Sequence, residues 1–222
     1  MGAQRAITTL SRLALAASLI GATVLSSGCV PLAVTGVAVG AMAATDRRSL
    51  GAQTDDQTIE VKALAQIQQD LKVLSGVSVT SYNRKVLLTG QVVDERTKRA
   101  IGDLVGRIDA VRSVQNELQV GTVVSMSTSA NDSGITASVK TAMIDAKDLQ
   151  SNAFKVVTEN GVVYLMGIVT RTEGDRGAQL ASRSSGVRKV VTVYEYVTDD
   201  ELARIVRSNE AAAKPAQEAP KQ

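Results

Sequence analysis

The chain has 222 residues, with no histidine, no tryptophan and a single cysteine. Because histidine is the commonest general base and metal ligand, its absence argues against most hydrolases and against zinc sites. The formal net charge of +3 is far below the basic excess of nucleic-acid-binding proteins. We therefore expect a protein that is not an enzyme, with no catalytic residue, no cofactor, no metal site and no nucleic-acid partner.

Residues 1–28 have the order of features found in a secretory signal peptide. Arg5 and Arg12 make the start positively charged, and Leu13–Leu25 is an apolar run of the usual length. That run is shorter than the ~20 residues that a membrane-spanning helix needs, so it favours a signal peptide over a transmembrane anchor.

Cys29 follows this segment directly and resembles the lipidated cysteine of bacterial lipoproteins. The small residues before it fit a lipobox, although Ser26 stands where leucine is usual. The resemblance implies cleavage before Cys29 and attachment of several acyl chains such as palmitate, which anchor far more firmly than one chain. An ordinary signal peptide followed by a chance cysteine is the alternative. Val30 is not the aspartate that retains lipoproteins at the inner membrane in enteric-type sorting, which implies an outer-membrane location facing the periplasm.

Residues 29–54 are expected to connect the lipid anchor to the folded part of the chain. Val30–Ala44 is apolar, rich in glycine and alanine, and too short to span a membrane. It fits a flexible spacer and a segment lying in the membrane interface equally well. Thr45–Thr54 is polar and is predicted to be a linker.

From Asp55 onward the sequence repeats itself at an offset of about 76 residues. The matching pairs are Asp56 with Asp132, Ile59 with Ile135, Val79 with Val156, Val86–Gly90 with Val163–Gly167, Val111 with Val187, and Val114 with Val190. Two copies of this length indicate tandem small domains, predicted at residues 55–122 and 131–197. Residues 198–222 are predicted to form a short helix, Asp199–Arg207, and a disordered tail, because the composition from Asn209 on is polar and lacks periodicity.

The first copy has the pattern helix, strand, strand, helix, strand. Its helices are predicted from two apolar stripes, formed by Ile59, Ala63, Ile67, Leu71 and Leu74 and by Ile101, Leu104, Val105 and Ile108. Strands are predicted around Val77–Tyr82, Lys85–Val92 and Ser113–Val120, with Asn83-Arg84 as a tight turn between the first two.

The second copy has the same pattern. Its first helical stripe consists of Ile135, Val139, Met143, Ala146 and Leu149. Strands are predicted near Ala153–Thr158, Val162–Val169 and Arg188–Val197, and a second helix at Arg171–Ser184. Asn160-Gly161 between the first two strands is the strongest short hairpin signal in the chain.

This element order and two short motifs resemble BON domains. The first motif is Val86, Leu88, Gly90 and Val92, repeated as Val163, Leu165, Gly167 and Val169; the second is Gly186, Val187 and Val190. The lipobox followed by two copies is similar to the dual-BON outer-membrane lipoproteins. The resemblance implies an α+β fold with two tandem BON domains, each αββαβ with a three-stranded mixed sheet packed on two helices.

Gly90 and Gly167 each lie inside a predicted strand, where glycine commonly marks a bulge or a close approach of backbone. We expect them to let a helix pack closely on the sheet. They do not form a phosphate-binding loop, because no glycine-rich fingerprint or helix start follows them.

Three acidic pairs, Asp55-Asp56, Asp94-Glu95 and Asp199-Asp200, flank predicted helices. Acidic side chains stabilise the first turn of a helix through its dipole. We therefore interpret the three pairs as helix caps and not as catalytic carboxylates.

The two copies differ most on the outer face of the sheet. The first copy carries polar residues there, which predicts a solvated face: Thr89, Gln91, Gln115, Glu117 and Gln119. The aligned residues of the second copy are Met166, Ile168, Val191, Val193 and Glu195. Burial would stabilise the apolar four by about 1.5–3 kcal/mol each, so we expect this face to be covered. The cover is the first domain, the C-terminal helix through Leu202, Ile205 and Val206, or a second copy in a homodimer.

The resemblance to dual-BON lipoproteins implies that the second domain contacts anionic phospholipid and that its first helix forms part of the contact surface. On this chain that helix is Ser133–Lys147, and the candidate contact residues are Ile135, Val139, Lys140, Met143 and Lys147. The lysines would meet anionic head groups while the apolar side chains enter the membrane interface. Gly134 departs from the large aromatic residue often found at its position. The apolar three also fit simple packing in the core.

The sequence therefore predicts an outer-membrane-anchored periplasmic lipoprotein that binds phospholipid through its second domain and supports envelope integrity. The alternative is a non-enzymatic adaptor that binds outer-membrane assembly or stress-response proteins. The sequence leaves the protein partner, the lipid species and the oligomeric state open.

Overall fold

A computed structural model of the chain describes residues 46–73, 76–121 and 126–217, which belong to one compact unit. The predicted signal peptide, Cys29, the apolar segment Val30–Ala44 and Leu74 lie outside the described residues.

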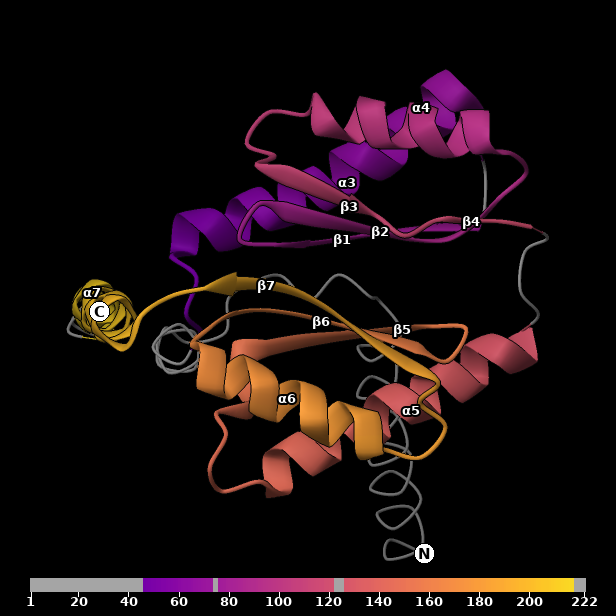
Figure 1. Cartoon of the computed structure of the whole chain (residues 1–222). Helices are drawn as coiled ribbons and strands as arrows, with labels where there is room; N and C mark the ends of the chain where they lie inside the picture. The colour runs from indigo at the N-terminus through magenta and orange to yellow at the C-terminus, as the bar shows by residue number, and fades with distance from the viewer. Residues whose placement is uncertain (1–45, 74–75, 122–125, 218–222) are drawn as a thin grey trace, which may run out of the picture. The chain divides into compact units, whose positions relative to one another are not determined.

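The first domain has the predicted αββαβ order, with both helices on one face of its sheet (Figure 1). Its elements are α3 (Leu50–Leu71), β1 (Val77–Tyr82), β2 (Lys85–Val92), α4 (Glu95–Gly106), β3 (Ser113–Asn116) and β4 (Gln119–Val120). Strand β1 pairs antiparallel with β2, whereas β3 and β4 pair parallel with it. The last predicted strand is thus in two pieces, because Leu118 between them turns its side chain into the core and is fully buried.

The second domain repeats this arrangement and confirms the mixed three-stranded sheet, in the order β5-β6-β7. Its elements are α5 (Met126–Asp145), a short 3-10 helix η1 (Ser151–Ala153), β5 (Phe154–Glu159), β6 (Val162–Val169), α6 (Arg171–Arg183) and β7 (Lys189–Tyr196). Helices α5 and α6 cover one face of the sheet (Figure 1). A further helix, α7 (Asp199–Gln217), follows β7.

Three helices extend beyond their predicted limits. Helix α5 begins at Met126, before the predicted Ser133, and ends at Asp145, before the predicted Lys147. Helix α3 begins at Leu50, within the predicted linker, because the Ser49 hydroxyl accepts a hydrogen bond from the Ala52 backbone N–H and caps the helix. Helix α7 continues past Arg207 to Gln217, where a disordered tail was predicted. Alanine, glutamate and lysine, which fill most of that segment, are strong helix formers.

Each domain has its own apolar core between its helices and its sheet. The predicted first-helix stripes supply Ile59, Ala63 and Ile67 to one core and Ile135, Val139 and Met143 to the other. Full burial of a large apolar side chain stabilises by about 1.5–3 kcal/mol. The helical spacing of these residues therefore determines which side of α3 and α5 faces the sheet.

A buried aspartate on the first helix of each domain holds the β-hairpin of that domain. The backbone N–H groups of Asn160 and Gly161 donate to Asp132 Oδ2 and Oδ1 at 2.6 and 2.8 Å. In the first domain Asn83 and Arg84 donate to Asp56 in the same way, at 2.8 and 2.6 Å. All four turn residues have positive φ, which directs both N–H groups of each hairpin turn toward one carboxylate.

These contacts revise the interpretation of the acidic pairs. Asp94 accepts the Thr97 N–H and caps α4, and Asp199 and Asp200 lie in the first turn of α7, as expected. Asp56 is not a cap: it lies in the second turn of α3 and binds the hairpin. Asp56 is only 2% exposed, and its buried charge is compensated by the ion pair with Arg48 and by hydrogen bonds from the turn amides and the Ser81 hydroxyl.

The two strand glycines lie where backbone segments approach closely, but the expected helix contact is wrong. A Cβ on Gly90 would lie 2.0 Å from the Gly76 carbonyl oxygen, and one on Gly167 would lie 2.5 Å from that of Ala153. Both carbonyls belong to the residue directly before the first strand of their sheet. The missing side chains of the two glycines therefore leave room for the backbone that leads into that strand.

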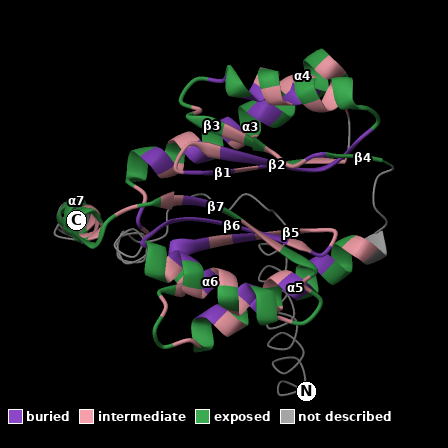
Figure 2. Cartoon of the chain, viewed as in Figure 1, coloured by how far each residue is buried: buried purple, intermediate pink, exposed green. Residues whose placement is uncertain are grey.

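The outer faces of the two sheets bury one another. Continuous burial of β2 and β6 after their first residues (Figure 2) means that both sides of these strands are covered, since alternate side chains point to opposite faces. A third apolar cluster joins the domains and contains Tyr82, Leu87, Tyr164, Met166, Ile168 and Val193. The first domain is therefore the main cover of the second sheet, and Ile205 of α7 packs at this cluster as well.

The predicted solvation of the first sheet is wrong for two of its residues. Thr89 and Gln91 are only 1% and 6% exposed, because the apolar face of the second sheet lies over them. The Gln91 amide donates to the Glu159 carboxylate at 3.1 Å, and burial raises the pKa of Glu159. Polar contacts therefore surround the shared apolar cluster.

Replacing the hairpin-binding carboxylate should destabilise the second domain. Asp132→Ala leaves two turn amides without an acceptor, so we expect the free energy of unfolding to fall by about 3 kcal/mol in urea titration. Asp145→Ala, which removes an exposed aspartate from the same helix, should change it by less than about 0.5 kcal/mol. Equal effects of the two substitutions would contradict this role of Asp132.

A charge placed in the shared cluster should separate the two sheets. Val193→Glu buries a carboxylate without a partner, so we expect a loss of about 3 kcal/mol or more. Thr192→Glu, at the exposed neighbouring position of β7, is the matched control and should be tolerated. Unchanged stability and oligomeric state in Val193→Glu would show that this face is not covered.

Candidate functional site

The candidate residues on α5 fall into two groups. Ile135, Val139 and Met143 are 4%, 0% and 1% exposed and belong to the core of the second domain. The expectation that they enter a membrane interface is therefore wrong, because their helical spacing directs them at the sheet. Lys140 and Lys147 are exposed.

Ile144 is the exposed apolar side chain of this region and was missed by sequence reasoning. It is 68% exposed, one helical turn after Lys140 on α5, and Lys147 follows in the turn after the end of the helix. The sequence does contain a signal for it, because Ile144 is a large apolar residue that does not belong to the apolar stripe of its amphipathic helix. Such a side chain has no role in the core.

A surface cavity of about 260 Å³ opens beside Ile144. Its lining comes from the last turns of α5, from η1 and from the start of β5: Lys140, Met143, Ile144, Ser151, Asn152 and Phe154. Phe154 is fixed from behind by an edge-to-face contact with Tyr194, with ring centroids 5.8 Å apart. The lining of the cavity therefore combines apolar side chains with one lysine and two polar side chains.

The charges around this cavity favour anions. Asp148 is paired with Arg176 at 2.8 Å, and the hydrogen bond from Arg176 lowers the pKa of Asp148. Asp145 is the remaining exposed carboxylate at this end of α5, beside two lysines. Gly134 lies near the middle of α5, and a Cβ added there would meet no atom within 4 Å, so there is room for a larger side chain at this position.

The short segment before α3 holds a second group of functional interest. The guanidinium of Arg47 donates to both Glu173 carboxylate oxygens, at 2.6 and 2.8 Å, to the Ile168 carbonyl oxygen at 2.8 Å and to Gln150 Oε1 at 3.0 Å. Burial alone would raise the pKa of Glu173, but the hydrogen bonds from Arg47 and the Thr170 N–H lower it. Arg47 itself is 4% exposed, so this segment docks firmly on the second domain.

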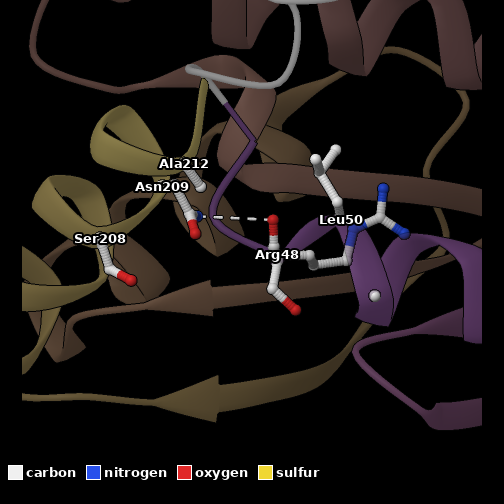
Figure 3. Close-up of a pocket in the computed structure, with 7 residues that line it drawn as sticks. Arg48, Leu50, Ser208, Asn209 and Ala212 are labelled. Atoms are coloured by element: carbon white, nitrogen blue, oxygen red, sulfur yellow. Dashed lines mark hydrogen bonds between the residues drawn. The ribbon is translucent and has the colours of Figure 1, made fainter. Parts of the chain in front are cut away.

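The next residue binds the first domain instead. Arg48 forms ion pairs with Asp46 and Asp56 at 2.7 and 2.9 Å and lies over the Tyr82 ring. The Asn209 amide of α7 donates to the carbonyl oxygens of Asp46 and Arg48, at 3.0 and 3.4 Å. A cavity of about 280 Å³ lies here, between the start of α3 and α7 (Figure 3).

Within the described residues, no group of three or more histidine, cysteine, aspartate or glutamate side chains could hold a metal ion. Among the helices in that part of the chain, none is long and apolar enough to cross a membrane. Exposed apolar side chains do occur on α3, at Val61 and Leu64.

Comparison with known proteins gives consistent matches along the chain. A model of the BON domain matches residues 55–122 and 131–197. The outer membrane lipoprotein DolP of Haemophilus influenzae is 39% identical over 191 residues, which cover 85% of this chain and 99% of that protein. A 21 kDa hemolysin of Actinobacillus pleuropneumoniae is 32% identical over 154 residues, which cover 68% of this chain and 79% of that protein.

One solved structure is CdsD, a structural protein of the type III secretion system of Chlamydia trachomatis. It matches 75% of this chain and 70% of its own length with 12% identity and a TM-score of 0.27. A score this low supports no conclusion about fold or function.

Proposed function

This chain belongs to the BON domain family, and from that premise we propose that it is an outer-membrane lipoprotein, anchored through Cys29 and facing the periplasm. We propose further that it binds anionic phospholipid through α5 of its second domain and thereby supports the integrity of the envelope. The similarity to an outer membrane lipoprotein over 99% of the length of that relative supports the location. The lipid site is supported by the exposed Ile144, with Lys140 one helical turn before it and Lys147 after the end of the helix.

The proposed contact uses one apolar side chain and two cations. Ile144 enters the interface between head groups and acyl chains, and the two lysines meet phosphate oxygens. A lysine near an anionic membrane surface contributes about 1 kcal/mol, and burial of an isoleucine side chain contributes about 1.5–3 kcal/mol. The sum is a weak, salt-sensitive site, which suits a protein whose lipid anchor already keeps it at the membrane.

The sheets are poor candidates for this contact. Their outer faces form the shared apolar cluster, and their inner faces are covered by helices. An outer helix face can meet a membrane without opening the fold, which favours α5.

An adaptor function is the second candidate, and one observation favours it. Val61 and Leu64 expose an apolar stripe on α3; Lys62 lies beside it, but no lysine stands three or four residues from either side chain, as Lys140 does from Ile144 on α5. Such a stripe suits an apolar protein surface better than an anionic membrane. Loss of envelope function in Val61→Ser with unchanged vesicle binding would favour this second candidate.

Vesicle co-sedimentation tests the lipid proposal directly. Residues 40–222, which contain all three apolar clusters, should pellet with vesicles rich in anionic phospholipid at low salt and be released by added salt. Ile144→Ser and Lys140→Glu should each reduce the bound fraction several-fold, by about 1 kcal/mol or more in binding free energy. Val61→Ser, which alters a 69% exposed apolar side chain on α3, is the matched control for the 68% exposed Ile144. Absence of binding by the unsubstituted fragment at low salt would refute the lipid site.

Substitution of the lipidated residue tests the anchor. Cys29→Ala removes the only thiol in the chain, so the protein should move from the membrane fraction to the soluble periplasmic fraction. The weak site on α5 is not expected to hold it at physiological salt. Continued recovery with membranes would mean that another part of the chain is the anchor.

A further inference from the structure

We propose that α3 is a self-association surface, through which two molecules of this chain pair on the membrane. The inference rests on the anchor proposed above and does not depend on the lipid site on α5. It identifies a second molecule of the chain as the partner of the exposed apolar side chains on α3, and it leaves α5 free to meet lipid.

The exposed residues of α3 follow the spacing of a coiled coil. In a coiled coil, the a and d positions of each heptad alternate at intervals of three and four residues and pack between the two helices. Six exposed residues of α3 have this spacing and form the α3 seam: Leu50, Thr54, Gln57, Val61, Leu64 and Gln68. Leu50, Val61 and Leu64 are 53%, 69% and 45% exposed. None of these three belongs to an apolar cluster of the described residues, so the fold does not explain them.

The α3 seam fits a second copy of itself. Its spacing is the same when it is read from either end, so two antiparallel helices related by a two-fold axis bring a positions against d positions. In the register centred between Val61 and Leu64, Val61 of one molecule meets Leu64 of the other, and Gln57 meets Gln68. Apolar side chains then lie at the centre, and amide side chains that can hydrogen-bond to each other flank them.

Charge and size along the α3 seam suit this partner. None of its six residues is charged, so two molecules bring no like charges together at the contact. The residues that follow its d positions are small and exposed, which lets a second helix approach closely: Gly51, Thr58 and Ala65. Lys62 is exposed and lies outside the seam, where water can solvate it.

The second domain lacks this surface. At the positions of Val61 and Leu64, α5 has Ala137 and the exposed Lys140. A lysine at this position would place two like charges near the centre of a symmetric pair, which is unfavourable. Self-association is therefore a property of the first domain, and the two domains use different helices for the partner and for lipid.

The pair is weak in solution and is favoured by a shared membrane. Helix α3 has 22 residues and is about 33 Å long. Two such helices, each about 10 Å wide, bury on the order of 700 Å² in total, which is below the threshold of about 1,000 Å² for a stable interface. Anchoring both molecules to one membrane raises their effective concentration, so that pairing occurs there.

Crosslinking of the full lipidated chain in phosphatidylcholine vesicles, which are neutral, tests the pair. Because Cys29 is the only cysteine and is consumed by lipid in the anchored chain, an introduced cysteine is the single free thiol. Val61→Cys lies in the α3 seam, and Val93→Cys, at an 80% exposed position of the same domain, is the control for random collision. With a short bifunctional maleimide, the dimer fraction of Val61→Cys should exceed that of Val93→Cys several-fold. Equal dimer fractions would overturn the proposal.

A charge in the α3 seam should abolish this excess. Adding Leu64→Glu to Val61→Cys should lower the dimer fraction to the level of Val93→Cys, because the two-fold axis brings two carboxylates to the contact. Gln69→Glu adds the same charge at an exposed position of α3 outside the seam and should leave the dimer fraction unchanged. Circular dichroism checks that each variant is folded. An excess that survives Leu64→Glu would show that the seam is not the contact.

Flotation of the chain with the vesicles reports the anchor separately. A chain that fails to float refutes the anchor, and the same crosslinking ratio, measured on the chain concentrated in solution, then decides whether the α3 seam pairs. A floating chain with equal dimer fractions in Val61→Cys and Val93→Cys refutes the pairing alone.

Discussion

The burial of the two outer sheet faces against each other is the constraint on which the rest of this structure depends. Tyr82 and Leu87 from the first sheet pack with the larger apolar set of the second, and each such side chain removed from water stabilises by about 1.5–3 kcal/mol. The outer faces of both sheets are therefore occupied by this contact and cannot bind anything else without separating the domains. Any surface that meets a membrane or a partner is therefore supplied by the helices, the hairpins or the segment before α3.

The repeated unit supplies one scaffold, and the two copies use it differently. Both hold their hairpin through a buried aspartate, Asp56 or Asp132, and both direct one helical stripe at the sheet. Only the surfaces differ: α3 exposes Val61 and Leu64, whereas α5 exposes Ile144 one helical turn after Lys140. This difference separates the proposed lipid contact of the second domain from a surface suited to protein on the first.

Local signals in the sequence predicted most of the fold. The hairpin strands Val77–Tyr82, Lys85–Val92 and Val162–Val169 have the limits expected from period-two patterning and the turn residues between them. The site was harder, because a helical stripe identifies the buried face and leaves the exposed face undefined. Ile135 and Val139 were mistaken for lipid contacts for that reason, and Ile144 was overlooked. Arg47 looked like a linker residue because its partners, Gln150 and Glu173, lie more than a hundred positions away in the sequence.

The central claim is that the outer face of α5, and not that of α3, meets the membrane. The chain has no tryptophan, so Ile144→Trp and Val61→Trp each introduce a single reporter at a nearly equally exposed position. Tryptophan fluorescence is then measured on anionic vesicles whose acyl chains carry bromine as a quencher. The account predicts strong quenching at position 144 and little at position 61, with the difference lost in Lys140→Glu. Equal quenching at both positions, or quenching at position 61 alone, would contradict it.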